Sequence, residues 1–103
     1  MNRPTSEGSR DPGLLILASL AGGPRHGYSM IEDIERFAGV RLGPGTLYGA
    51  IGRLEQRGLI VAVESVDRRR PYRLTPNGGL VLDKEVEALE RVVRLARRTV
   101  ARE

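Results

Sequence analysis

The sequence contains no cysteine and no tryptophan, one histidine, one lysine, and only four residues that are phenylalanine or tyrosine. Without cysteine, neither disulfides nor thiolate metal ligands can form. The single histidine, His26, cannot hold a metal ion alone and is interpreted as a capping or packing residue. We therefore expect no metal site and no cofactor.

A long apolar run is also missing. The longest stretch, residues 14–21, is much shorter than the roughly 20 residues that a membrane-spanning helix needs. No signal peptide, with its charged, apolar and small-residue regions, opens the chain. These absences favour a cytoplasmic protein that does not contact membranes.

Motifs for catalysis are absent as well. We find neither a glycine-rich phosphate loop nor a nucleophile accompanied by a base. The carboxylates Glu32, Asp33 and Glu35 are interpreted as the solvated face of a helix, because nothing pairs them with an apolar pocket suited to acid–base work. The sequence therefore does not predict an enzyme.

The chain does have enough apolar residues for one packed domain, at 40% of 103 residues. Its net charge is +4, and nearly all the positive charge is arginine. Arginine suits bidentate contacts with phosphate and guanine. A GC-rich genome also supplies arginine by default, so charge alone leaves nucleic-acid binding open.

Two helices are predicted in the first third of the chain. The first begins at Asp11-Pro12, a capping residue followed by a proline suited to the first turn, and ends at residues 22–24. It is apolar nearly all round, which predicts burial on several sides, in part against another subunit. The second runs from about residue 26 to Phe37, with an apolar stripe at helical spacing, and Gly39 closes it.

A third helix and a hairpin follow. The helix opens at Gly43-Pro44, and Gly58 is well placed to end it in the left-handed conformation. Residues 59–66 are rich in valine and isoleucine, as a strand should be, and residues 71–74 form a second strand. The charged turn at 67–70 would make the tip of this hairpin basic.

The last helix is predicted from Thr75-Pro76 to near the end of the chain. Its apolar residues alternate spacings of four and three, which is a heptad seam. Val92 and Leu95 widen this seam. We expect a flexible arm at 1–11, a DNA-binding domain at 12–75 and a dimerisation helix at 76–103.

This order of elements predicts a mainly α fold with a small β-hairpin (α+β), namely a winged helix-turn-helix with a long C-terminal dimerisation helix. In that architecture the third helix enters a major groove, and the hairpin forms a wing that lies against phosphates or a minor groove.

The sequence resembles the PadR family of winged-helix transcriptional regulators from about Asp11 to Val100. The matching segments are Leu15-Ile16-Leu17, His26-Gly27-Tyr28, Pro44-Gly45-Thr46-Leu47-Tyr48, Arg53-Leu54-Glu55, Gly58-Leu59-Ile60 and Tyr72-Arg73-Leu74-Thr75. The resemblance implies a homodimeric repressor of the short subclass, whose final helix crosses to the partner subunit. Two departures are Gly43, where the family commonly has serine or threonine, and Gly49, where proline often stands.

The candidate DNA-binding residues come from the second helix, the third helix and the wing. They are Arg25, Tyr28, Gly45, Thr46, Tyr48, Gly49, Arg53, Arg68, Arg69 and Arg70. Some of these residues also have an interpretation that does not involve DNA. Tyr28 and Tyr48 could be core residues, and Arg53 and the wing arginines could be solvated charges.

The candidate dimer interface lies on the first and last helices. Its residues are Leu14, Leu17, Leu82, Val86, Leu89, Val93, Ala96 and Val100. We therefore predict a sequence-specific DNA-binding transcriptional regulator that acts as a homodimeric repressor on an inverted-repeat operator. The alternative is a winged-helix protein–protein interaction module without specific DNA binding. A small-molecule effector is conceivable but unidentified.

Overall fold

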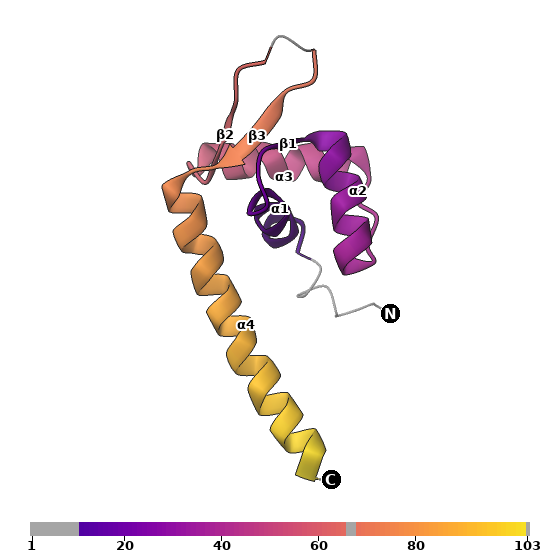
Figure 1. Ribbon diagram of the computed structural model, residues 1–103, viewed down its shortest axis with the longest axis vertical. Helices are drawn as coiled ribbons and strands as arrows, with labels where there is room; N and C mark the ends of the chain where they lie inside the picture. Colours follow the sequence, from indigo (N-terminus) through magenta and orange to yellow (C-terminus); the bar gives the residue numbers. More distant parts are fainter. Residues whose placement is uncertain (1–10, 66–67, 103) are drawn as a thin grey trace.

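The computed structural model describes residues 11–65 and 68–102. The elements, in chain order, are α1 (Pro12–Leu20), β1 (Arg25–His26), α2 (Gly27–Ala38), α3 (Pro44–Gln56), β2 (Ile60–Ala62), β3 (Pro71–Leu74) and α4 (Pro76–Arg102) (Figure 1). The mainly helical α+β class predicted from the sequence is confirmed. The predicted arm falls outside the described residues apart from Asp11.

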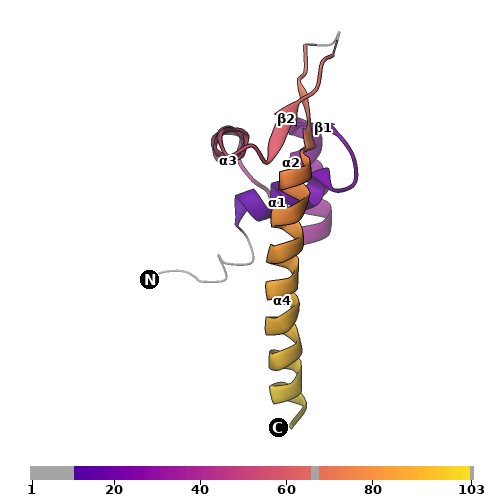
Figure 2. The same ribbon diagram turned by 90° about the vertical axis from the view of Figure 1, so that its left-hand side faces the viewer.

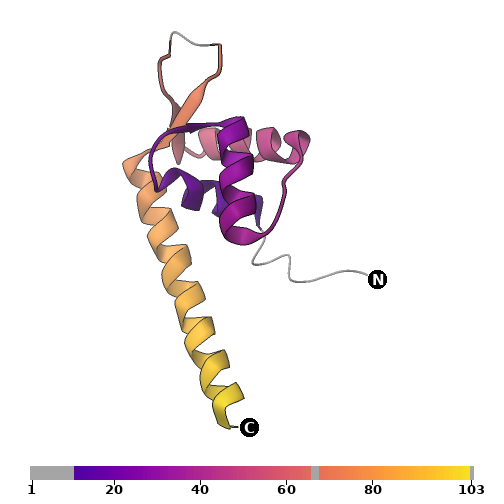
Figure 3. The same cartoon turned by 45° about the vertical axis from the view of Figure 1, so that its right-hand side comes forward.

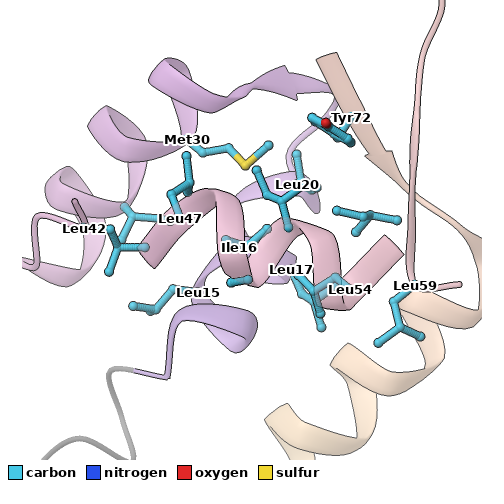
Figure 4. Packing of buried hydrophobic residues seen from close by; sticks show 14 of the residues in the cluster. Leu15, Ile16, Leu17, Leu20, Met30, Leu42, Leu47, Leu54, Leu59 and Tyr72 are labelled. Atoms are coloured by element: carbon cyan, nitrogen blue, oxygen red, sulfur yellow. The ribbon is translucent and has the colours of Figure 1, made fainter. Parts of the chain in front are cut away.

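Helix α1 lies at the centre of the domain and contacts α2, α3, α4 and β3 (Figure 4). It begins as predicted, because the Asp11 carboxylate accepts a hydrogen bond from the backbone N–H of Leu14 at 3.4 Å and Pro12 follows. Ile16 is completely buried and Leu17 is 3% exposed. The apolar residues around this helix are therefore covered mostly within one chain.

The ends of α2 and α3 follow from local chemistry. His26 caps α2, since its Nδ1 accepts a hydrogen bond from the N–H of Ser29, and Gly39 ends the helix in the left-handed conformation. Gly58 does the same after α3, with φ of 74°. There the N–H groups of Gly58 and Leu59 donate to the carbonyls of Glu55 and Leu54 at 2.9 and 3.0 Å, a Schellman motif.

The three strands form an antiparallel sheet in the order β1-β3-β2. In the predicted hairpin, Ile60 pairs with Leu74 and Ala62 with Tyr72. The first strand is shorter than predicted, because ladder pairing ends near Val63, whose N–H donates to the carbonyl of Pro71. Strand β1 is an addition: two residues are too few to leave a periodic pattern. Of the predicted basic turn, Asp67 lies outside the described residues.

Asp33 is not solvated as predicted. Its side chain is 14% exposed and accepts hydrogen bonds from the buried Ser19 hydroxyl at 2.7 Å and from Arg36 at 2.8 Å. A hydroxyl so deeply buried needs a partner, and the carboxylate on α2 supplies one. The neighbouring Glu32 and Glu35 are exposed, as expected.

Helix α4 is tied to the end of α3 at its first turn. The N–H and hydroxyl of Thr75 donate to the carbonyls of Leu59 and Gly58, at 3.1 and 2.6 Å. The same hydroxyl accepts from the N–H of Gly78 at 3.0 Å, which caps the helix. Gly78 lies so close to the Leu59 carbonyl that a Cβ would overlap it.

Beyond Leu82, α4 leaves the domain and extends away from it (Figures 1 and 3). Residues 83–101 are all exposed. Figure 2 shows the wing and the tip of α4 at opposite ends of the molecule. Within the described residues, no helix is long and apolar enough to cross a membrane.

Candidate nucleic-acid interface

Helix α3 buries one side and presents the other to solvent. Leu47, Ile51 and Leu54 are at most 3% exposed and belong to the core, and Figure 4 shows Leu47 and Leu54 there. The opposite side therefore points outward, and the predicted contacts Gly45, Thr46, Tyr48, Gly49 and Arg53 all lie on exposed positions. Gly43, with no capping side chain, precedes the first turn.

Two tyrosines lie at the surface and not in the core. Tyr28 is 55% exposed and Tyr48 is 53% exposed. The phenol of Tyr48 lies directly on Gly27, where a Cβ would overlap the ring. Glycine at the first residue of α2 is therefore what lets α2 and α3 approach each other at their N-terminal ends.

The start of α2, helix α3 and the wing share one cleft. We call it the wing cleft; it is lined by His26, Gly27, Tyr28, Tyr48, Arg68, Arg69, Arg70 and Tyr72. All three arginines are exposed. The structure thus brings the predicted wing arginines and both surface tyrosines together around a single concave, positively charged surface.

Arg25 stands apart from this group. It does not line the wing cleft, and its Nε donates to the carbonyl of Ser19 at 3.1 Å and lies 3.5 Å from the Asp33 carboxylate. Its side chain is 27% exposed. The structure gives this residue a place in the packing of α1 against α2, which sequence reasoning did not anticipate.

The Asp33 carboxylate is the centre of that packing. The hydrogen bond from Ser19 lowers its pKa below the ordinary 3.8, the positive charges of Arg25 and Arg36 act in the same direction, and burial opposes them. It is therefore ionised at neutral pH. Arg41 is also paired, with Glu35. Three arginines near α2 are thus held by two carboxylates of the chain.

The predicted dimer residues divide into two groups. Leu17 and Leu82 belong to the chain's own core, at 3% and 9% exposure, and have almost no surface to offer a partner. Leu14 is half-buried. The rest of the seam is open: the exposures are 40% for Val86, 39% for Leu89, 45% for Val93 and 71% for Val100, and Ala96 is also exposed.

A shallow groove lies at the base of α4, between α1 and α3. We call it the root groove; it is lined by Asp11, Gly13, Leu14, Leu17, Leu54, Arg57, Val81 and Glu85. Its α4 residues, Val81 and Glu85, each precede a residue of the apolar seam. Across the described ranges, no cluster of three or more acidic or histidine side chains could hold a metal ion.

The fold and the basic wing cleft define a winged-helix protein of the DNA-binding type. Residues 16–84 match the family described as the transcriptional regulator PadR-like family. The chain belongs to this family, and it is therefore a transcriptional regulator and not an enzyme.

Two relatives are similar in sequence. An uncharacterized 37.1 kDa protein in transposon TN4556 of Streptomyces fradiae is 44% identical over 84 residues, which cover 82% of this chain and 24% of that protein. The chain thus spans about a quarter of that relative's length. The transcriptional regulator Rv3488 of Mycobacterium tuberculosis is 39% identical over 84 residues, covering 79% of this chain and 78% of that protein.

Solved structures share the fold. A transcriptional regulator from Clostridium thermocellum superposes with a TM-score of 0.78 at 25% identity, covering 94% of this chain and 97% of that chain. A PadR family transcription regulator from Clostridium difficile has a TM-score of 0.78 at 22% identity, covering 86% of this chain and 97% of that chain.

Proposed function

We propose that the chain is a homodimeric repressor that binds an inverted-repeat operator in double-stranded DNA. The observation that carries this proposal is the wing cleft, in which three wing arginines face the exposed start of α2 and the Tyr48 side of α3. A duplex with α3 in its major groove would place a phosphate strand along this cleft. Arg68–Arg70 would then neutralise backbone charge, while Thr46 and the N-terminus of α3 would hold another phosphate.

The open seam of α4 supports a second copy of the chain as its occupant. Val86, Leu89, Val93 and Val100 would remain in water in a monomer. Burying each one fully is worth roughly 1.5–3 kcal/mol, so the seam favours association strongly.

The direction of that pairing follows from where the seam begins. Leu82, on the line of the seam, packs against the chain's own core, so the seam faces the side of α4 on which the domain lies (Figure 3). A parallel partner helix would occupy the same space as this domain. An antiparallel partner instead passes beneath α1 and brings its C-terminal end toward the root groove.

The charged side chains along α4 also favour an antiparallel partner. The first half of the exposed length carries four carboxylates, at Asp83, Glu85, Glu87 and Glu90, and the second half four arginines, at Arg91, Arg94, Arg97 and Arg98. In an antiparallel pair, the acidic half of one helix lies beside the basic half of the other, and the charges attract. In a parallel pair, halves of the same charge lie together and repel. The two-fold axis would pass near Arg91, where Val86 faces Ala96 of the partner subunit.

Cysteine pairs test this arrangement directly, because the wild-type chain has no cysteine. Val86→Cys and Ala96→Cys chains should form a mixed disulfide dimer when combined and oxidised. If Val86→Cys instead links to itself, the helices are parallel and the proposed direction is wrong.

Repression requires only that the dimer occupy DNA that the transcription machinery would otherwise use. Two α3 helices related by a two-fold axis would enter successive major grooves, about 34 Å apart. The symmetry of the operator would then mirror the symmetry of the dimer.

The test is binding to the DNA upstream of the chain's own coding region, measured by fluorescence anisotropy over a range of salt concentrations. We expect preference over scrambled DNA of the same composition, and in transcription assays reduced output from that promoter. Changing Arg68, Arg69 and Arg70 together to alanine should weaken binding to all sequences and flatten the salt dependence. Equal affinity for both DNAs would instead favour a protein-interaction module.

A further inference from the structure

The outward side of α3 contains a line of three glycines among its exposed positions. Gly45, Gly49 and Gly52 follow one another at spacings of four and three, so they lie on one line along the helix. A Cβ at Gly45 or Gly52 would meet no atom within 4 Å. The middle of this surface is bare backbone, which can approach DNA more closely than a helix covered by larger residues.

Arg53 is the long cationic side chain beside that bare surface. It is exposed, and its Nη1 lies 3.6 Å from the position that a Cβ at Gly49 would occupy. The side chain therefore runs back toward the start of the helix, as helical side chains do, and its guanidinium sits level with the middle of α3.

Within the described part of the chain, no hydrogen bond or ion pair holds the guanidinium of Arg53, whereas Asp33 or Glu35 holds Arg25, Arg36 and Arg41. Its five N–H donors are thus available to a ligand.

We propose that Arg53 reads a guanine, donating from its guanidinium to O6 and N7 in the major groove; this rests on the proposed DNA-binding function. The planar fork of arginine matches these two acceptors. The position of the guanidinium along α3 favours contact with a base over contact with a phosphate. Phosphates line the walls of the groove and are reached from the ends and flanks of a helix, whereas this guanidinium lies at mid-helix, against the bare stripe that faces the groove floor.

Two of the exposed side chains near the start of α3 are directed elsewhere. Tyr48 is turned onto Gly27, and Thr46 lies in the first turn, where phosphate contacts are favoured. Each half-site should therefore contain one guanine whose identity matters strongly, related by the operator's symmetry to a second, with weaker preferences elsewhere.

The experiment compares wild type with Arg53→Ala and Arg53→Lys on a panel of operators. Each operator carries one symmetric pair of base changes, and all proteins are compared at the same series of salt concentrations. For wild type, replacing the critical G·C pair with A·T should weaken binding about 5- to 150-fold per half-site. Arg53→Ala should bind the original and the changed operator alike while keeping its preferences at other positions. Arg53→Lys should lose part of the discrimination, because an ammonium lacks the fork.

Arg73→Ala is the matched control, since Arg73 is an exposed arginine that lines neither the wing cleft nor the root groove. It should leave the base preferences unchanged. The proposal is overturned if Arg53→Ala weakens all operators equally and reduces the salt slope by about one per subunit, because that identifies a phosphate contact. Wild type without any base preference would mean that the proposed repressor function itself fails.

Discussion

The winged domain and the exposed length of α4 contain similar apolar residues but differ in how far these residues are buried. In the domain, most apolar residues of α1, α2 and α3 are covered within one chain, although Phe37 on α2 is 51% exposed, and Ile16, Met30 and Leu47 are fully buried (Figure 4). In α4, after Leu82, valines and leucines at regular spacing stay open. The described residues of the domain thus cover one another's apolar side chains, whereas they leave the seam of α4 exposed.

The largest effect should come from placing a charge on the α4 seam. Leu89→Glu should raise the dimer dissociation constant by about 100-fold or more, because each of two subunits loses roughly 1.5–3 kcal/mol of burial. Sedimentation equilibrium measures this. Lys84→Gln, at an exposed position on the other side of α4, is the control and should leave association nearly unchanged. A wild-type chain that sediments as a monomer would remove the contrast between the two regions.

The next largest effect, on stability, should come from the first turn of α4, where this helix joins the winged domain. Gly78→Ala should destabilise the chain by about 3 kcal/mol, since the new Cβ meets the Leu59 carbonyl and backbone cannot move aside cheaply. Gly79→Ala, one residue on and with no atom nearby, should instead stabilise the helix by about 0.5–1 kcal/mol. Denaturant unfolding distinguishes the two. Similar values would mean that α4 is not anchored through Gly78.

Inside the domain, removal of one carboxylate should cost less. Asp33→Ala leaves the Ser19 hydroxyl buried without its acceptor, and we expect a loss of about 1–3 kcal/mol at neutral pH. The neighbouring Glu32→Ala, at an exposed position, should change stability by less than about 0.5 kcal/mol.

The loss of stability caused by Asp33→Ala should depend on pH. Because the folded-state pKa of Asp33 lies below 3.8, its ionisation adds stability at neutral pH that is lost as the pH falls from 3.8 through the folded-state pKa. The stability gap between wild type and Asp33→Ala should therefore narrow in acid. A gap that stays constant would contradict the lowered pKa.

The smallest effect concerns the bare surface of α3. Gly52→Ala should raise stability by about 0.5–1 kcal/mol, because its Cβ meets nothing. It should nevertheless weaken operator binding, since the methyl holds the helix away from the groove. Gly79→Ala, with a similar gain in stability, is the control and should bind DNA as wild type does. Unchanged binding by Gly52→Ala would mean that this side of α3 does not face DNA.

The sequence predicted the helices well because each has chemical signals at its ends. Asp11-Pro12, Gly39, Gly58 and Thr75 all begin or end helices where expected. The contacts that depend on distant segments were not predictable. Nothing in the local pattern distinguishes Asp33 from the neighbouring solvated carboxylates, because its partner Ser19 lies on another helix. For the same reason, the paired state of Arg25 and the contact between Tyr48 and Gly27 emerge only from the fold.

The candidate site was predictable in outline for a similar reason. A basic hairpin after a glycine-rich helix start places the wing arginines and Tyr48 in one region, and the structure gathers them around the wing cleft. The core positions of Leu17 and Leu82 were missed, because a heptad pattern does not say whether its first members face the chain's own domain or a partner.

Thr75 fixes the start of the long helix α4 to the winged domain. Three hydrogen bonds at this one residue join the end of α3, the first residues of the wing and the start of α4. The helix beyond it is about 40 Å long at 1.5 Å per residue. A rotation of about 10° at this joint would move the far tip by about 7 Å, which is more than the pitch of about 5.4 Å of one helical turn. Any ligand or strain that tilts α4 would therefore reset the distance between the two α3 helices of a dimer without touching the DNA-binding surface.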